Sequence, residues 1–264
     1  MTFDPGRVRL TLTMDEGVVS RAGAACERPD VARLLRGQPA EQAVALVPLI
    51  YSLCGKAQGI AARVALDAAR GDPVETHVDA DVLAEAAREH AWKLFIDWPR
   101  QLGLDPDEAF FVRLLRAKPD QRNEMAALLA IHPLLTKLRE VIGAGGLAEL
   151  LAARMAVRRQ ELQDWLLDVS GTLGGVGSMV IAPRIGEACV ETARGLLTHR
   201  LALTGDHIAD YTIKAPTDTH FSAGGDVEKR LEQLRGMSQA QAEQQALRLV
   251  MAFDPCVPWC CEFS

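Results

Sequence analysis

Cysteine is the residue type with the greatest chemical potential in this sequence, and three of its six copies lie near the C-terminal end: Cys256, Cys260 and Cys261. An Asp254–Pro255 turn precedes them, and a fourth thiol, Cys54, lies far upstream. Thiolates bind soft metals such as nickel, iron, copper(I) and zinc, because sulfur donates strongly and loses its proton on coordination. The two cysteine sites therefore predict a metal site to which both ends of the chain contribute. Cys26 and Cys189 are expected to be small buried hydrophobic residues.

The composition indicates a globular protein. With 264 residues, 48% of them hydrophobic, the chain has enough apolar side chains for a substantial core, which we assign to one domain over residues 1–264. The net charge of -6 disfavours nucleic acid and anionic membranes as partners. The N-terminal segment lacks the features of a signal peptide, and the apolar runs are shorter than the roughly 18 residues of a membrane span. We therefore expect a cytoplasmic protein with reduced thiols.

The elements that must position these thiols are expected to be mostly helices. Alternating apolar residues over 7–13, a turn at 15–17 and a second run at 18–21 predict a β-hairpin. Apolar residues at helical spacing predict helices over 39–51, 57–69, 80–95, 107–116, 123–130, 146–167, 186–203 and 238–251. Pro48 interrupts the first of these and places Cys54 near a helix boundary. The predicted fold class is α+β, mainly α-helical with a small N-terminal β-hairpin or sheet.

One glycine-rich segment, residues 170–178, resembles a phosphate-binding loop in composition only. A phosphate loop ends in Gly-Lys-Ser or Gly-Lys-Thr, whereas the corresponding residues here are Gly177, Ser178 and Met179. We interpret the segment as a flexible connection, with anion binding as the alternative.

Five ordered segments resemble the large subunit of nickel–iron hydrogenases. Residues 253–256 are similar to the start of that family's C-terminal Asp-Pro-Cys-x-x-Cys-x-x-His motif, and residues 52–57 to a degraded copy of its N-terminal Arg-x-Cys-Gly-x-Cys motif. Between them, residues 191–199 resemble its Glu-x-x-Arg-Gly-x-Leu-x-His element, residues 211–221 its Pro-Thr-x-x-Asn segment, and residues 95–98 its Leu-Asp-Trp. The resemblance covers most of the chain in patches and implies a reduced form of the large-subunit fold.

Departures from the family pattern bear on activity. In the family four thiolates hold nickel and iron, but here Ala57 stands in place of the second cysteine of the first pair, and Ala61 in place of the following histidine. The resemblance therefore implies that nickel is not bound and that the protein is not an enzyme. Cys256 and Cys260 are separated by one residue more than in the family, and Cys261 is adjacent. Either Cys260 or Cys261 can therefore correspond to the second cysteine of the motif.

A protein that keeps some ligands and loses the nickel site resembles the accessory scaffolds of hydrogenase maturation, of the HupK/HoxV type. This resemblance implies that the chain transiently carries or helps to assemble an iron unit, Fe(CN)2CO, before its transfer to the hydrogenase large subunit. The implied iron ligands are Cys54 and Cys256, with Cys260 as the third metal-site cysteine. The implied partners are a small maturation chaperone, iron-handling maturation proteins and the large subunit itself.

The same resemblance implies residues around the iron. Arg194 would donate hydrogen bonds to a cyanide nitrogen or offset the negative charge of thiolates and cyanides. Asp254 would pair with Arg194 and orient Cys256, and Asp97 is a further member of this shell. For all three the alternative is an ordinary structural ion pair. His199 is expected to be a packed helix residue.

Three other functions compete with the iron scaffold. An active hydrogenase or redox enzyme would need the cysteine that Ala57 replaces. A zinc-stabilised domain would use Cys256, Cys260 and Cys261 with a histidine, although zinc sites normally have ligand pairs two to four residues apart in two clusters. A metal-free interaction protein or regulator that mimics the large subunit would need no ligand at all.

Overall fold

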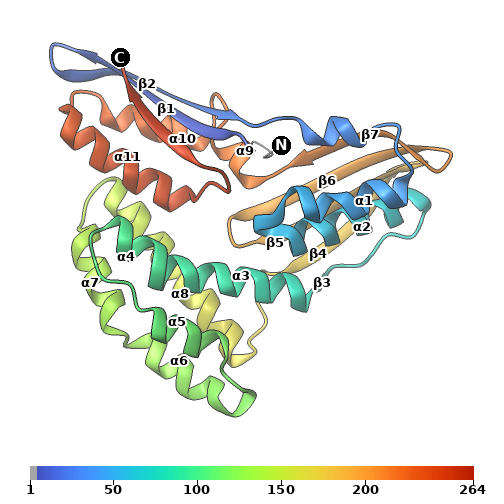
Figure 1. The fold of residues 1–264 in the computed structure, drawn as a ribbon, viewed down its shortest axis with the longest axis horizontal. Helices are drawn as coiled ribbons and strands as arrows, with labels where there is room; N and C mark the ends of the chain where they lie inside the picture. The colour runs from blue at the N-terminus through green and yellow to red at the C-terminus, as the bar shows by residue number, and fades with distance from the viewer. Residues whose placement is uncertain (1–4) are drawn as a thin grey trace. The chain divides into compact units, whose positions relative to one another are not determined.

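The computed structural model describes residues 5–264 and divides into two compact units (Figure 1). Unit 1 contains the described residues up to 28 together with 87–170 and 217–264, and unit 2 contains 29–86 and 171–216. The chain thus passes between the units four times, at 28/29, 86/87, 170/171 and 216/217. The chain therefore does not form two domains that follow one another in sequence. The single domain over residues 1–264 stays a prediction.

Unit 1 contains a three-stranded sheet in the order β2-β1-β8. Its strands are β1 (Arg7–Asp15), β2 (Val18–Glu27) and β8 (Trp259–Phe263). The antiparallel pair β1–β2 confirms the predicted hairpin, and its tight turn uses Glu16 and Gly17, both with positive φ (48° and 82°). Strand β8 was not predicted, and it pairs in parallel with β1. The sheet lies beside α10 and α11 (Figure 1).

Helices form the rest of unit 1. They are α4 (Trp98–Gln101), α5 (Glu108–Leu115), α6 (Arg122–Ala130), α7 (Pro133–Ile142), α8 (Leu147–Leu167), α9 (Pro216–His220), α10 (Asp226–Leu231) and α11 (Gln239–Phe253). Helix α3 (Ala80–Trp92) begins in unit 2 and continues through a π-helical segment, Lys93–Asp97, into α4. The predicted helices over 80–95, 107–116, 123–130, 146–167 and 238–251 are confirmed, whereas α7 and the short α4, α9 and α10 were not predicted.

Unit 2 is built on a five-stranded antiparallel sheet in the order β3-β4-β5-β6-β7. The strands are β3 (His77–Val78), β4 (Gly175–Ala182), β5 (Ile185–Thr192), β6 (Gly195–Thr204) and β7 (His207–Lys214). The helix predicted over 186–203 is therefore wrong, because this segment forms β5, a turn and β6. The flexible connection predicted over 170–178 is wrong in its second half, which begins β4.

Helices α1 (Ala40–Ile50) and α2 (Gly55–Arg70) cover one face of this sheet and confirm the helices predicted over 39–51 and 57–69 (Figure 1). Helix α2 packs closely on the sheet because its buried face is made of small side chains, mostly alanine. A Cβ atom placed on Gly186 of β5 would lie 2.2 Å from the Ala65 carbonyl oxygen and 2.4 Å from the Ala69 nitrogen. Glycine at this position therefore lets the strand contact the backbone of α2.

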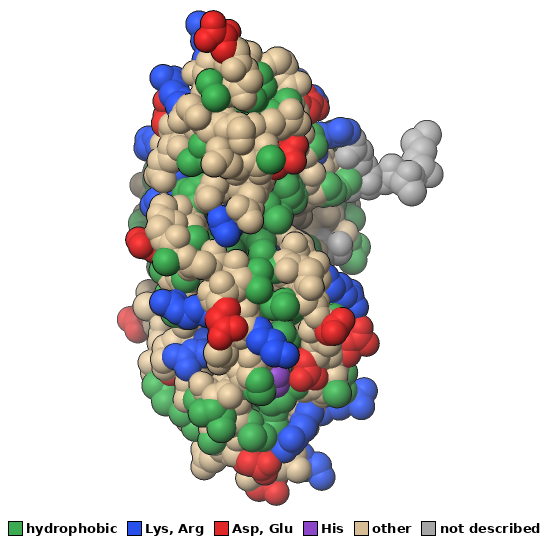
Figure 2. Space-filling view, turned by 90° about the vertical axis from the view of Figure 1, so that its left-hand side faces the viewer, with side chains coloured by type: hydrophobic (Ala, Val, Ile, Leu, Met, Phe, Trp, Pro, Cys, Tyr) green, Lys and Arg blue, Asp and Glu red, His purple; other side chains and the backbone are tan. Residues whose placement is uncertain are grey.

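Within the described residues, no helix combines the length and apolar character that crossing a bilayer requires. On the face that Figure 2 presents, basic and acidic side chains are interspersed among hydrophobic ones. This face therefore has no extended field of a single sign to attract a polyanion.

Candidate functional site

Cys54 precedes α2 in unit 2, as the last residue of a short 3-10 turn, Ser52–Cys54, and as the N-cap of the helix. Its position confirms the predicted helix boundary, and Pro48 lies inside the preceding α1. The side chain is half-buried.

The first turn of α2 is closed to a second thiolate. Ala57, which replaces the family's second cysteine, is 1% exposed and packs in the core of unit 2. The backbone N–H groups of Lys56 and Ala57 donate to the two carboxylate oxygens of Glu85, at 2.8 and 3.1 Å. Glu85 thus satisfies amides that would otherwise be available to an anion at this helix end.

A chain of buried polar side chains leads away from Cys54. The Gln58 amide nitrogen lies 3.7 Å from the Cys54 sulfur, and the Gln58 carbonyl oxygen lies 2.9 Å from His199 Nε2. His199 Nδ1 lies 2.9 Å from the Tyr211 hydroxyl. Gln58, His199 and Tyr211 are each at most 1% exposed. Burial lowers the pKa of His199 to about 3, so the imidazole is neutral at pH 7.

His199 corrects one sequence-based expectation. It is packed, as expected, but it belongs to strand β6 and not to a helix. Alternate residues of β6 face α2, and the pairing of His199 with Ile213 on β7 brings its ring beside Tyr211. Gln58 and Tyr211 could not be recognised as its partners from the sequence, because they lie 141 and 12 residues away.

Arg194 lies in the turn between β5 and β6, also in unit 2. Its backbone N–H donates to the Thr192 hydroxyl oxygen at 3.3 Å, and that hydroxyl donates to the Gly195 carbonyl at 2.7 Å. Gly195 has φ 126°, which favours glycine. The Arg194 residue is only 9% exposed. The turn therefore holds a cation largely out of solvent, as a role beside an anionic metal unit would require.

Cys256 lies in unit 1 after α11 and is half-buried. Its backbone N–H donates to the Thr217 hydroxyl oxygen at 3.0 Å, and the same hydroxyl donates to the Cys256 sulfur at 3.3 Å. Thr217 is 1% exposed and belongs to α9, in the segment that resembles the family's Pro-Thr-x-x-Asn. Thr217 thus fixes both the backbone and the thiol of Cys256.

Asp254 ends α11 with φ 48°, and it is buried. Its Oδ1 lies 2.7 Å from Lys93 Nζ, and its Oδ2 accepts from Arg158 Nη2 at 2.7 Å. Lys93 Nζ also donates to Asp97 Oδ2 at 2.8 Å. Burial would lower the pKa of Lys93, but the charges of Asp254 and Asp97 outweigh burial and raise it. The two predicted aspartates are thus brought together by a lysine that the sequence did not single out.

The network around Asp254 continues deeper into unit 1. Arg158 is 0% exposed and its Nη1 lies 2.9 Å from His90 Nδ1, while His90 Nε2 lies 2.8 Å from Glu161. Burial lowers the pKa of His90 to about 4, although hydrogen bonding to Glu161 opposes the shift. The predicted pairing of Asp254 with Arg194 stays a prediction, because these residues belong to different units.

Cys260 and Cys261 occupy successive positions of β8, opposite Arg9 and Leu10 of β1. Successive strand residues point to opposite faces of a sheet. Cys261 packs against the apolar core of unit 1, as Cys256 does, and burial raises its pKa to about 11. Cys260 shares the other face with Arg9 and Glu262. Cys261 is thus the one that shares a core with Cys256, and the ligand role of Cys260 stays a prediction.

The zinc alternative required the three terminal thiols to converge with a histidine. Their opposite orientations on β8 disfavour this arrangement, and the described residues contain no group of three or more His, Cys, Asp or Glu side chains placed to hold a metal ion.

Cys26 is expected from the sequence to be a small buried hydrophobic residue, but in the structure it also makes a polar contact. Its S–H donates to Asp218 at 3.5 Å, and burial, followed by the charge of Asp218, raises its pKa to about 12, to which nearby Cys256 also contributes.

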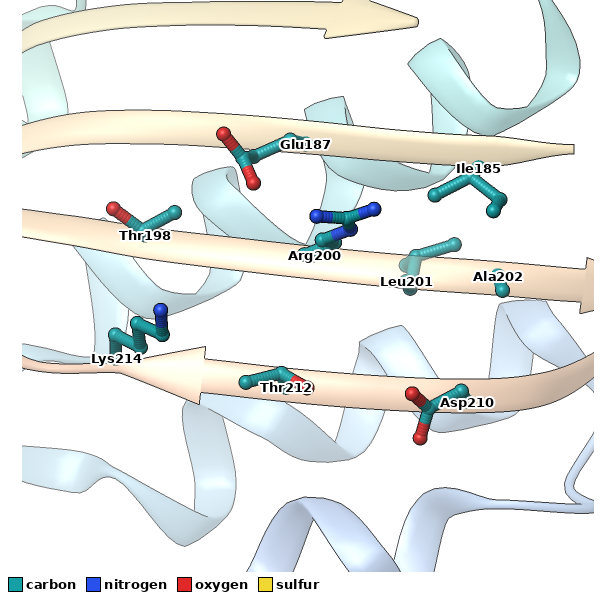
Figure 3. A pocket seen from close by; sticks show the side chains of 9 residues that line it. All are labelled: Ile185, Glu187, Thr198, Arg200, Leu201, Ala202, Asp210, Thr212 and Lys214. Carbon is teal, nitrogen blue, oxygen red and sulfur yellow. The ribbon is translucent and has the colours of Figure 1, made fainter. Parts of the chain in front are cut away.

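A separate cavity of about 340 Å³ lies on the sheet of unit 2 (Figure 3). Glu187 stands opposite Arg200, and Thr198 stands opposite Lys214, on the face that the β6 alternation turns away from α2. Both signs of charge line the cavity, together with threonine hydroxyls. This side of the sheet is opposite to the one where His199 meets Gln58, so the cavity is distinct from the surroundings of Cys54.

Comparison with known proteins identifies relatives along the whole chain, although no family model matches the sequence. Hydrogenase expression/formation protein HoxV of Cupriavidus necator is 27% identical, with 100% of this chain and 95% of that protein covered. Hydrogenase expression/formation protein HupV of Azotobacter chroococcum is 26% identical over 96% of this chain and 97% of that protein. The protein HupK of Rhodobacter capsulatus is 46% identical over 76 residues, 29% of this chain and 24% of that protein.

Solved structures agree in fold. The reduced Ni-Fe-Se hydrogenase from Desulfomicrobium baculatum matches with a TM-score of 0.57 at 13% identity, covering 93% of this chain and 95% of that chain. An NAD+-reducing [NiFe]-hydrogenase matches with a TM-score of 0.58 at 14% identity, covering 96% and 97%. The chain is therefore a relative of the hydrogenase expression/formation proteins with the α+β fold of the hydrogenase large subunit, which confirms the predicted resemblance and fold class.

Proposed function

We propose that this protein is an accessory factor of nickel–iron hydrogenase maturation that holds an Fe(CN)2CO unit on thiolates before transfer to the large subunit. The maturation role follows from the names of its relatives, the hydrogenase expression/formation proteins, which match over nearly the whole chain. One structural observation supports the iron-binding part. The sulfurs of Cys54 and Cys256, which hold the two motif positions, each lie within hydrogen-bonding distance of a buried neutral side chain, Gln58 and Thr217.

The proposed ligand set suits a cargo that must leave again. Low-spin iron with cyanide and carbonyl ligands is soft enough to favour thiolate sulfur. Two thiolates, Cys54 and Cys256, would bind such an iron less firmly than the four thiolates of the related enzymes, and the buried Ala57 removes a bridging ligand. Neutral hydrogen-bond donors at sulfur also draw electron density from the thiolate and weaken its donation to the metal. We therefore propose an exchangeable iron and no nickel, with Cys260 as the third thiol of the site.

Charged residues would support the ligands without binding the iron. Arg194 would offset the negative charge of thiolates and cyanides, or donate to a cyanide nitrogen. Asp254 would hold the backbone before Cys256 in one conformation, because Lys93 and Arg158 fix both of its carboxylate oxygens. Asp97 would help to place Lys93.

Substitution of single cysteines tests the ligand proposal. We expect Cys54→Ser and Cys256→Ser each to abolish hydrogenase maturation in cells while leaving the thermal unfolding of the protein near that of the wild type. Cys189→Ser is the matched control, because Cys189 is also a half-buried thiol, on β5, but lies outside both motifs. Normal maturation by both motif variants would overturn the iron-carrier proposal.

The second candidate is a metal-free interaction protein that mimics the large subunit. The lack of a group of three or more potential ligands among the described residues favours it. In that case maturation would survive the cysteine substitutions but would still depend on binding a small maturation chaperone, iron-handling maturation proteins or the large subunit in the cytoplasm. Co-purification of the Cys54→Ser and Cys256→Ser variants with these partners separates the two candidates.

A further inference from the structure

We infer that Gln58 is a positioning residue that directs a hydrogen-bond donor at the Cys54 sulfur, and that His199 and Tyr211 set the direction of this donor. The inference rests on the proposed function only in giving Cys54 a ligand role, because the hydrogen-bond chain is a property of the metal-free protein. Gln58 lies four residues after Cys54 on α2, so the two side chains share one side of the first turns of the helix.

The direction of the chain follows from what each atom can do. The Gln58 carbonyl oxygen can only accept, so the nitrogen that faces it, His199 Nε2, must donate. A neutral imidazole has one N–H, so His199 Nδ1 accepts, and the Tyr211 hydroxyl donates to it. The Gln58 NH2 group is then the part of the amide that faces Cys54, where it donates to the sulfur.

The reversed chain is disfavoured by burial. If the Gln58 amide were turned, His199 would have to donate from Nδ1 to the Tyr211 oxygen, and the Tyr211 O–H would lose His199 as its acceptor in this buried chain. A buried hydroxyl without a partner costs roughly 1–3 kcal/mol. The reversed amide would also place the Gln58 oxygen, an acceptor, against the sulfur. Three side chains at most 1% exposed cannot exchange these bonds for water.

The Gln58 amide is neutral, so it places a donor at the Cys54 sulfur without adding charge beside it. Cys256 has an equivalent arrangement, because the Thr217 hydroxyl oxygen is already occupied by the Cys256 N–H and its hydrogen is directed at the sulfur. Each motif thiol is thus met by one neutral donor from its own unit.

Nitrogen-15 NMR of the histidine side chains in the metal-free wild-type protein tests the direction. We expect His199, identified by its loss in His199→Gln, to show a protonated Nε2 and an unprotonated Nδ1 at pH 7. A proton on Nδ1 would reverse the chain, place the Gln58 oxygen against the sulfur and overturn the inference. If His199→Gln does not fold, selective labelling and the contact with Tyr211 provide the assignment.

Tyr211→Phe is the second variant, and it is read out by the same NMR measurement. It removes the hydroxyl that donates to His199 Nδ1, so the share of the tautomer protonated at Nε2 should fall relative to the wild type. An unchanged tautomer in folded Tyr211→Phe would overturn the part of the inference that gives Tyr211 a role. Because iron takes no part in these measurements, such a failure would leave the iron-carrier proposal standing, and a protein without iron would leave the donor chain intact.

Discussion

Asp254 is the only buried acidic side chain among the described residues, and its two cationic partners are the reason that a charge can be buried there. Lys93 is largely buried and Arg158 completely so. The carboxylate therefore joins the end of α11 to the π-helical segment and to α8. The conformation of the chain that leads into Cys256 depends on this ion network.

Asp254→Asn would leave two buried cations with a neutral partner. We expect it to lower the free energy of unfolding by about 3–5 kcal/mol, the usual result of breaking a buried ion pair from one side. Chemical denaturation of the purified protein measures the change. Glu232→Gln is the matched control, because its pair with Arg235 is exposed and should contribute less than about 1 kcal/mol. A loss below about 1 kcal/mol for Asp254→Asn would show that the network is not what stabilises this region.

The lowered pKa of His90 predicts how the free energy of unfolding depends on pH. Its pKa is lowered in the folded protein from 6.5 to about 4, chiefly by burial. Between these values the unfolded chain binds a proton that the folded protein does not, so the free energy of unfolding should fall as the pH falls from about 6.5 to 4. His199 and Glu161 act in the same direction, because the folded-state pKa of each is also lowered.

The corresponding measurement is urea denaturation across this pH range. His90→Gln should flatten the dependence relative to the wild type, and His207→Gln, at an exposed position, should leave it unchanged. Equal slopes for the wild type and His90→Gln would contradict the assignment of a buried neutral His90.

At the scale of elements, α2 determines where Cys54 and Gln58 lie, and α2 is held by close packing on the sheet of unit 2. Alanines on α2 and Gly186 on β5 make this packing possible, because any Cβ at position 186 would meet the backbone of α2 at Ala65 and Ala69. The closest approach is between main-chain atoms, which cannot move aside as a flexible side chain can.

Gly186→Ala should therefore destabilise the protein by about 1–3 kcal/mol or more, the usual effect of overpacking a tight core. Thermal and chemical unfolding measure the change. Gly171→Ala is the control within the same unit, because a Cβ at position 171 meets no atom within 4 Å. Similar stabilities for the two variants would mean that α2 can move away from the sheet without cost.

Sequence reasoning identified the helices better than the sheet of unit 2. In β6 the buried positions alternate, as the strand period requires, but one of them is the polar His199, and this hides the pattern. The turn containing Arg194 also divides what looked like one helix into two strands. Strand β8 is too short to be recognised from alternation alone, because it has five residues. Two of them, Cys260 and Cys261, are interpreted in the sequence only as metal ligands.

Only the residues of the candidate site that belong to recognisable motifs could be predicted from the sequence. Cys54, Cys256 and Asp254 stand out because they belong to recognisable segments. Four further residues belong to no motif that a reader of the sequence could recognise. Each has a role only because the fold places it beside a partner: Gln58, Thr217, Lys93 and Arg158. Buried polar residues in long-range pairs are therefore what a single sequence does not reveal.

At the scale of the whole molecule, each unit carries one motif thiol with its own neutral donor, Cys54 in unit 2 and Cys256 in unit 1. Both units are covered by the matches to the hydrogenase expression/formation proteins, which extend over nearly the entire chain. The fold of the hydrogenase large subunit is kept, while Ala57 and Ala61 replace a cysteine and a histidine of the motif that the enzymes use. The chain is therefore a relative of the hydrogenase expression/formation proteins that has the fold of the hydrogenase large subunit, and the iron-carrier role stays a proposal.

Infrared spectroscopy is the most direct test of whether the protein carries an Fe(CN)2CO unit. The protein would be purified without oxygen from cells that express the hydrogenase maturation proteins, and the metal content of the same sample would be measured. For an iron carrier we expect bands in the cyanide and carbonyl stretching regions, with iron and without nickel, and loss of these bands in Cys54→Ser and Cys256→Ser but not in Cys189→Ser. A spectrum without such bands, from folded protein with zinc or no metal, would contradict it and favour the metal-free interaction protein.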